Sequence, residues 1–147
     1  MYLAYFVVAI AGAALASTPL SVVGTGVYFV LAIFLYRSFR QGDPVVALAL
    51  LPLAALGCLM QGIGMVQADR DTQRLALLFF GLFLVVLGYL LARSTFAPRP
   101  LAYALALAGL GWCAVMIPGL PVALLAGVML IGGLSEIALA LWLLIAR

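Results

Sequence analysis

The stretch LALLFFGLFLVVLGYLL (Leu75–Leu91) carries no charge and lies between two charged segments, QADRDTQR before it and ARSTFAPRP after it. A helix that crosses the hydrocarbon core of a bilayer needs about 20 mostly apolar residues. The stretch comes close to that length, and the arginines on both sides stand where lipid headgroups would lie. It therefore predicts a transmembrane helix.

The composition of the whole chain agrees with this prediction. Hydrophobic residues make up 69% of the sequence and charged residues only 7%, whereas soluble domains are roughly 45–50% apolar and about 25% charged. No segment is both long and polar enough to form a soluble domain. We therefore predict a membrane protein with a single integral membrane domain over residues 1–147.

Turn residues and arginines divide the apolar sequence into about six helices. The first predicted segment reaches only about 22 Å of a hydrocarbon core of about 30 Å. It ends in Ala14-Leu15-Ala16, which resembles a signal-peptidase site, but no positive region precedes it, so we expect the segment to be retained. The predicted fold is an all-α, polytopic transmembrane bundle of six helices, with five as the alternative. The predicted segments are Tyr2–Ala16, Leu20–Tyr36, Val45–Val66, Leu75–Leu91, Leu101–Ile117 and Val122–Ala146.

Arginines are divided unequally between the two ends of the predicted bundle. Cytoplasmic loops of membrane proteins are enriched in Lys and Arg. If the N-terminus is cytoplasmic, the outer end holds only Arg70 and Arg74. Both termini are therefore predicted to lie inside. The cytoplasmic-face anchors are then Arg37, Arg40, Arg93, Arg99 and Arg147.

Glycines are abundant, with fifteen in the chain. In a bilayer, helices associate through close van der Waals contact, which small residues permit. We expect these residues to form a tight bundle, and a substrate pathway lined by the same glycines is the alternative. Trp112 is predicted level with Gly127, a pairing typical of a large side chain packed against a small one. The predicted helix-packing residues are Gly81, Gly88, Gly127, Gly132, Gly133 and Ala140.

Missing residue types exclude several functions. The chain has no histidine, so histidine-ligated haem or chlorophyll and a Ser-His dyad are excluded, and Ser135 is not an activated nucleophile. The acidic residues form no metal-ligand cluster, and the scattered arginines form no nucleic-acid surface. Cys58 and Cys113 lie in apolar runs and are expected to be unreactive. We predict no enzyme activity, cofactor or metal.

Glu136 is the single charge expected inside the bilayer. Its helical neighbours are mostly small, so it is predicted to face another helix. A hairpin centred on Gly119 and Leu120 sets Glu136 level with Tyr103, and the preceding hairpin sets Tyr103 level with Tyr89. We therefore predict an intramembrane polar cluster of Glu136, Tyr103 and Tyr89, in which the hydroxyls could donate to or accept from the carboxyl group.

The role of this cluster is open at this point. Glu136 could be an interhelical hydrogen-bond anchor, a proton- or cation-coupling group, or a contact to a partner subunit or lipid headgroup. The two tyrosines could equally be interfacial anchors near the cytoplasmic arginines.

The C-terminal half resembles a known family. The sequence FFGLFLVVLGYLLARSTFAPRPLAYALALAGLGW (Phe79–Trp112), the later Pro118 and Pro121, and the ending GGLSEIALALWLLIAR are similar to a bacterial family of polytopic membrane proteins, the domain of unknown function 4386. The resemblance implies no catalytic residues. The positions that match its recurring pattern are Gly88, Tyr89, Arg93, Pro98, Gly109, Glu136 and Trp142.

Two functions follow as expectations. The first is a structural or accessory subunit that packs against other subunits in a larger membrane complex, for example a respiratory or photosynthetic one. The alternative is a small transporter or proton-coupled carrier that uses Glu136. Either would be a multi-pass protein of the bacterial cytoplasmic (inner) membrane, in contact with the lipid bilayer.

Overall fold

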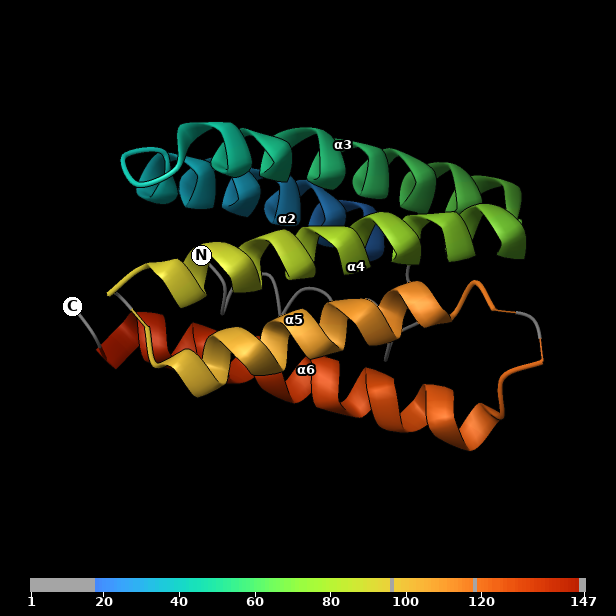
Figure 1. The fold of residues 1–147 in the computed structure, drawn as a ribbon. Coiled ribbons are helices and arrows are strands. Elements are labelled where there is room, and N and C mark those ends of the chain that lie inside the picture. The colour runs from blue at the N-terminus through green and yellow to red at the C-terminus, as the bar shows by residue number, and fades with distance from the viewer. Residues whose placement is uncertain (1–17, 96, 118, 146–147) are drawn as a thin grey trace.

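The computed structural model describes residues 18–95, 97–117 and 119–145, and all regular structure within these ranges is α-helical. Short connections join the helices, so that successive helices run antiparallel and pack side by side (Figure 1). This confirms the predicted all-α bundle. The predicted first segment, Tyr2–Ala16, and Arg147 lie outside the described residues. The helices are α2 (Thr18–Phe39), α3 (Pro44–Gln67), α4 (Arg70–Arg93), α5 (Arg99–Ala114) and α6 (Val122–Ile145).

The connection between α2 and α3 shows why α3 begins where it does. The side chain of Asp43 accepts a hydrogen bond from the Val46 backbone N–H at 3.1 Å. Pro44 follows directly, and proline suits the first helical position because its missing N–H would have no partner there. At the other end, Ala68 adopts a left-handed conformation with φ 53° and terminates the helix.

Several predicted boundaries differ from the structure by up to five residues, among them the end of α2 at Phe39, three residues after the predicted Tyr36. Helix α4 begins at Arg70, five residues before the predicted Leu75, because Asp69 accepts hydrogen bonds from the backbone N–H groups of Asp71 (3.1 Å) and Thr72 (3.2 Å). Helix α5 ends at Ala114, three residues before the predicted Ile117. There the Ile117 N–H bonds to the Ala114 carbonyl at 2.9 Å, a tighter pattern typical of helix ends.

The buried core runs through the middle of the bundle. Tyr28 of α2 contacts two rings of α4, with centroids 4.9 Å from Phe80 and 5.2 Å from Phe83. Leu139 and Ala140 of α6 belong to the same buried cluster, as do side chains of α3 and α5. All five described helices therefore share one core.

Three of the described helices are long and apolar enough to cross a membrane, namely Pro44–Gln67, Arg70–Arg93 and, within α6, Ala126–Leu143. The chain is a membrane protein. Helix α5 has 16 residues, which reach about 24 Å at 1.5 Å per residue. Helix α4 lies more centrally than α3, since 44% of its apolar span is buried within the chain against 22% for α3.

The arginines separate between the two ends of the bundle. Arg37, Arg40, Arg93 and Arg99 lie at the ends of α2, α4 and α5 that are close to the C-terminal end of α6. Arg70 and Arg74 lie at the opposite end (Figure 1). Four of the five arginines predicted for the cytoplasmic face thus lie together, and the fifth, Arg147, is outside the described residues.

Candidate functional site

The inward face of α6 carries Glu136, which among the described residues is the only acidic side chain beyond the first turn of a helix. Glu136 is 6% exposed, and Leu139 and Ala140 on the same face are 1% and 3% exposed. Glu136 therefore faces the interior of the bundle, in agreement with the small size of its helical neighbours.

Ser135 lies beside Glu136 and is equally buried. Its hydroxyl donates to the Ile131 carbonyl one turn earlier, at 2.7 Å. Serine often makes this bond in a helix, and it uses the only proton of the hydroxyl. Ser135 is therefore engaged with its own backbone rather than with Glu136.

The Glu136 carboxyl group makes no hydrogen bond to any described residue. Burying an ionised carboxylate without a partner costs far more than burying the neutral acid. Ionisable groups in transmembrane segments are accordingly rare and mark functional sites by default. Glu136 is the candidate functional group of this chain.

Trp112 of α5 is the second polar group of this region. Its indole Nε1 is buried and has no hydrogen-bond partner among the described residues. This nitrogen occupies the space that a Cβ on Gly132 of α6 would fill. Buried indole N–H groups normally find an acceptor. A donor without a described partner therefore lies against α6 one turn before Glu136.

The two groups approach the same level of the bundle from opposite directions. Side chains of a helix lean toward its N-terminus, so Glu136 extends along α6 toward Gly132, about 6 Å away at 1.5 Å per residue. Trp112 reaches Gly132 from the antiparallel helix. Because Gly132 has no side chain, it leaves room there. Trp112 and Glu136 thus form a donor and an acceptor, neither bonded within the described residues, that are directed toward one glycine.

The two predicted tyrosine partners lie elsewhere. Tyr103 is 58% exposed and Tyr89 is 43% exposed, while Glu136 is buried. The Tyr89 hydroxyl accepts a hydrogen bond from Arg93 at 2.6 Å, and the guanidinium lies 5.5 Å from the ring centroid. The predicted three-residue cluster is therefore not joined by hydrogen bonds among the described residues. Turn geometry predicts how far along a hairpin a side chain lies, but not the direction in which it points.

Tyr89 and Arg93 instead belong to the end of the bundle. Arg93 also approaches the Asp43 carboxylate at 3.8 Å, linking the end of α4 to the start of α3. Both side chains are partly exposed, so this pair contributes little to stability. Aromatic and arginine side chains at this level are typical of the membrane interface.

The glycines on α4 lie in close contact with α5. A Cβ on Gly81 would be 2.7 Å from the Gly109 carbonyl oxygen, and one on Gly88 would be 2.7 Å from that of Ala102. Both glycines therefore lie where two helix backbones meet. The Cys113 thiol adds a weak bond to the Leu78 carbonyl at 3.8 Å.

The predicted packing residues of α6 divide into two groups. Gly132 lies against Trp112, and Ala140 lies in the core. At Gly127 and Gly133, in contrast, an added Cβ would meet no atom of the described residues within 4 Å. The sequence predicts that these two glycines pack helices within the bundle. The structure leaves them open because the α5 contact lies on another side of α6.

Sequence reasoning missed the role of Trp112, for which it predicts only a large side chain packed against Gly127. The indole lies against Gly132 instead. The signal that could have identified its polar role is the indole N–H itself, since a tryptophan deep in an apolar helix needs an acceptor. Sequence reasoning also missed Gln73 of α4, whose side-chain amide donates to the Gly64 carbonyl of α3 at 3.0 Å.

Comparison with known proteins shows that this site lies in the part of the chain that matches a protein-family model. The model of one family, described as "Domain of unknown function (DUF4386)", matches residues 65–146. No curated protein and no solved structure matches the chain. The matched residues include α4, α5 and α6, and therefore both Trp112 and Glu136. The match confirms the resemblance of the C-terminal half.

Proposed function

Since the chain belongs to the DUF4386 family, whose description names no activity, we propose a function from the geometry of its helices. We propose that the protein is a non-enzymatic, multi-pass subunit of a larger assembly in the bacterial cytoplasmic membrane. In this proposal it binds a helix of another membrane protein through the outer face of α6.

The open face of α6 carries this proposal. Gly127 and Gly133 leave the space beside the α6 backbone empty among the described residues. In lipid, such small residues allow two helix backbones to approach closely, which is the main source of attraction between helices. Among the described helices, α6 packs substantially only against α5. Apolar side chains beside the glycines, Leu130 and Leu134, are more than half exposed and would flank the partner helix.

The test is to fill this space and to measure assembly. The tagged full-length chain is solubilised from its native membranes in mild detergent, and its complex is sized. A Gly133→Leu variant should release the chain from the complex. The matched control is Gly62→Leu on α3, where a side chain also has open space. A wild-type chain that is solitary and monodisperse, or equal effects of the two variants, would refute the proposal.

Both termini are proposed to lie on the cytoplasmic side, as the arginine distribution favours. Single cysteines introduced at Gln41 and at Arg70, at opposite ends of the bundle, in a chain whose own Cys58 and Cys113 are replaced by alanine, would react with a membrane-impermeant thiol reagent from opposite sides. In whole cells, labelling should occur at residue 70. Labelling of residue 41 alone would show that the orientation is the reverse of the proposed one.

A second candidate function rests on a different observation, the buried Glu136 without a hydrogen bond among the described residues. A carboxyl group in this state can bind a proton or a cation when the opposing helix moves, with the Trp112 N–H as the donor to its ionised form. The protein would then be a small proton- or cation-coupled carrier.

Purified protein in liposomes would test the carrier candidate. Wild-type protein should produce a proton-linked flux, and Glu136→Gln should abolish it. The control is Ser135→Ala, because Ser135 is equally buried but bonds only to its own helix. Absence of flux in wild type, or unchanged flux in Glu136→Gln, would exclude this role.

A further inference from the structure

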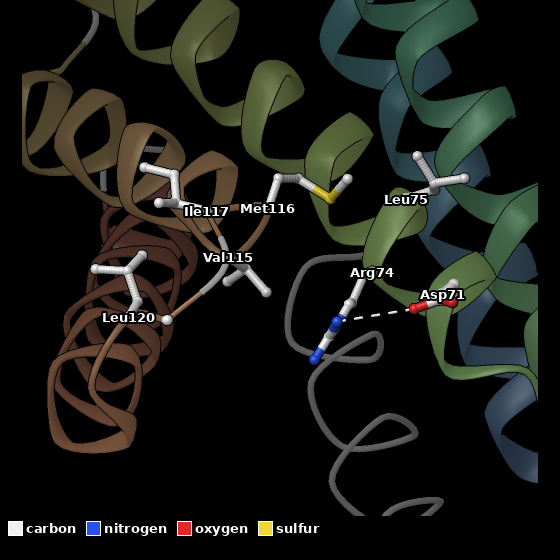
Figure 2. A pocket seen from close by; sticks show the side chains of 8 residues that line it. Asp71, Arg74, Leu75, Val115, Met116, Ile117 and Leu120 are labelled. Carbon is white, nitrogen blue, oxygen red and sulfur yellow. Dashed lines mark ion pairs between the residues drawn. The ribbon is translucent and has the colours of Figure 1, made fainter.

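A pocket of about 410 Å³ lies at the end of the bundle opposite to Arg93, between the start of α4 and the connection from α5 to α6. Figure 2 shows Arg74 and Asp71 on one side and Val115, Met116 and Ile117 on the other. Its volume falls within the range of roughly 300–1,000 Å³ that is usual for small-ligand sites. The pocket is separate from Glu136, which lies near the middle of α6.

The pocket is lined by one positively charged side chain, Arg74, and one negatively charged side chain, Asp71, and its other lining residues are apolar. The Arg74 Nη1 lies 3.7 Å from the Asp71 Oδ1, and the two side chains are 62% and 88% exposed (Figure 2). An exposed ion pair of this length contributes little to stability, because water screens the charges and both side chains lose conformational freedom when they pair. Both charges are therefore available to a ligand at small cost.

The position of the pocket along the membrane normal indicates the kind of ligand. Helix α4 has 24 residues, which span about 36 Å and exceed a hydrocarbon core of about 30 Å. Its first turn, with Asp71 and Arg74, therefore reaches the headgroup level. Leu75 and Ile117 are 39% and 57% exposed at the pocket and provide an apolar rim next to the charges. The pocket thus lies where headgroups meet acyl chains.

We propose that this pocket binds a zwitterionic phospholipid whose headgroup carries a primary ammonium. The phosphate accepts hydrogen bonds from the Arg74 guanidinium, and the ammonium donates to the Asp71 carboxylate. The acyl chains lie along the apolar rim at Leu75 and Ile117.

The charges at the pocket distinguish this ligand from other lipids. A headgroup with only negative charge would pair with Arg74 but be repelled by the Asp71 carboxylate, which has no partner other than Arg74 among the described residues. A trimethylammonium headgroup has no N–H to donate to the carboxylate. A headgroup with both a phosphate and an ammonium N–H complements both the Arg74 cation and the Asp71 anion. This inference is independent of the proposed docking of α6.

The test measures lipid binding to the delipidated full-length chain in mild detergent by native mass spectrometry. The probes are phosphatidylethanolamine, phosphatidylcholine and phosphatidylglycerol with identical acyl chains. Wild-type protein should bind phosphatidylethanolamine most tightly. Arg74→Gln should weaken that binding about fivefold, as expected for one charge-assisted contact at a partly exposed site.

Asp71→Asn gives the sharper result, because it should weaken phosphatidylethanolamine binding and strengthen phosphatidylglycerol binding. Arg40→Gln, at the other end of the bundle, is the control and should change neither. Helix content measured by circular dichroism verifies that each variant is folded. Equal binding of the three lipids by wild type, parallel effects of Asp71→Asn on all three, or an Arg40→Gln effect equal to that of Arg74→Gln would each overturn the proposal.

Discussion

Helix α5 packs against two neighbours in two different ways. Toward α4 the contact is made by backbone atoms. The space beside Gly109 is occupied by the carbonyl of Gly81 and, at 2.8 Å, by the backbone nitrogen of Val85. About two helical turns along α4 from Gly81, Gly88 meets the backbone of α5 in the same manner. These atoms cannot move without moving the helices.

Toward α6 the contact is made by side chains. The space beside Gly111 is occupied by the side chain of Val128, and that beside Gly132 by the indole of Trp112. Side chains can change rotamer at a modest cost while the helix axes stay in place. The second contact is therefore adjustable.

The difference identifies which part of the molecule is fixed and which part can respond. The α4–α5 pair forms a rigid unit, because backbone-to-backbone contact has no alternative arrangement at the same helix separation. Helix α6, which carries Glu136 and the two open glycines, is joined to that unit through groups that can rearrange. A helix of this kind suits either proposed function. As a subunit, α6 would bind a helix of another protein, and as a carrier it would bring Glu136 to a proton or cation.

The largest expected effect is that of Gly109→Ala. A methyl group at this position would overlap the Gly81 carbonyl and the Val85 backbone, so the two helices must separate. Overpacking of this kind costs about 1–3 kcal/mol, and we expect a value at the upper end because no side chain can yield. Thermal unfolding in detergent, followed by circular dichroism, measures the loss.

The matched control for Gly109→Ala is Gly127→Ala on α6. Space is open there among the described residues, and alanine favours the helix over glycine by up to about 1 kcal/mol. Unfolding should therefore be unchanged or slightly delayed. Equal destabilisation by the two variants would show that α4–α5 is not the rigid contact.

A smaller effect is expected for Gly132→Ala. The new methyl group would displace the indole of Trp112, which can rotate, so the cost should be about 1 kcal/mol, at the low end for overpacking. The readout is tryptophan fluorescence in a Trp142→Phe background, where Trp112 is the remaining one of the two tryptophans. The emission should shift while the helix content stays the same. An unchanged spectrum would mean that the indole does not lie against Gly132.

Much of the fold could be predicted from the sequence, because charge and proline mark the ends of apolar helices. The partner of Glu136 could not. A short turn determines how far along the hairpin two residues lie, and Gly111 and Val128, equally distant from the turn, do meet. Glu136 and Tyr103 are also equally distant from it, but the rotation of each helix about its axis decides which side chains face each other. In helices that are apolar on all sides, the sequence contains no periodic signal for that rotation.

The open glycines of α6 illustrate the same limit. Gly127, Gly132 and Gly133 are equally small, and the sequence predicts packing for all three. Only Gly132 contacts a described neighbour closely. Residue size indicates that a helix can approach, whereas the arrangement in space decides whether it does so within this chain.

The smallest expected effect concerns the start of α4 and tests whether the rigid unit depends on its cap. The Thr72 hydroxyl donates to the Asp69 carboxylate, and together with the backbone N–H groups of Asp71 and Thr72 it lowers the pKa of Asp69 below its usual value. A carboxylate whose folded pKa is lowered stabilises the folded state above the unfolded pKa of about 3.9. That contribution is lost as the pH falls through the lower, folded pKa. We therefore expect the amide protons in the first turn of α4 to lose protection from hydrogen exchange on acidification below about pH 4.

The amides around Gly81 and Gly88 are the internal comparison for this experiment and should stay protected in acid, because no carboxyl group lies among their contacts. Asp69→Asn retains an acceptor at the cap and should remove the pH dependence of the first turn. If acid instead opened the Gly81 region together with the first turn, the α4–α5 contact would not be an independent unit. The two sides of α5 would then not differ in rigidity, since the backbone contact with α4 would open as readily as the side-chain contact with α6.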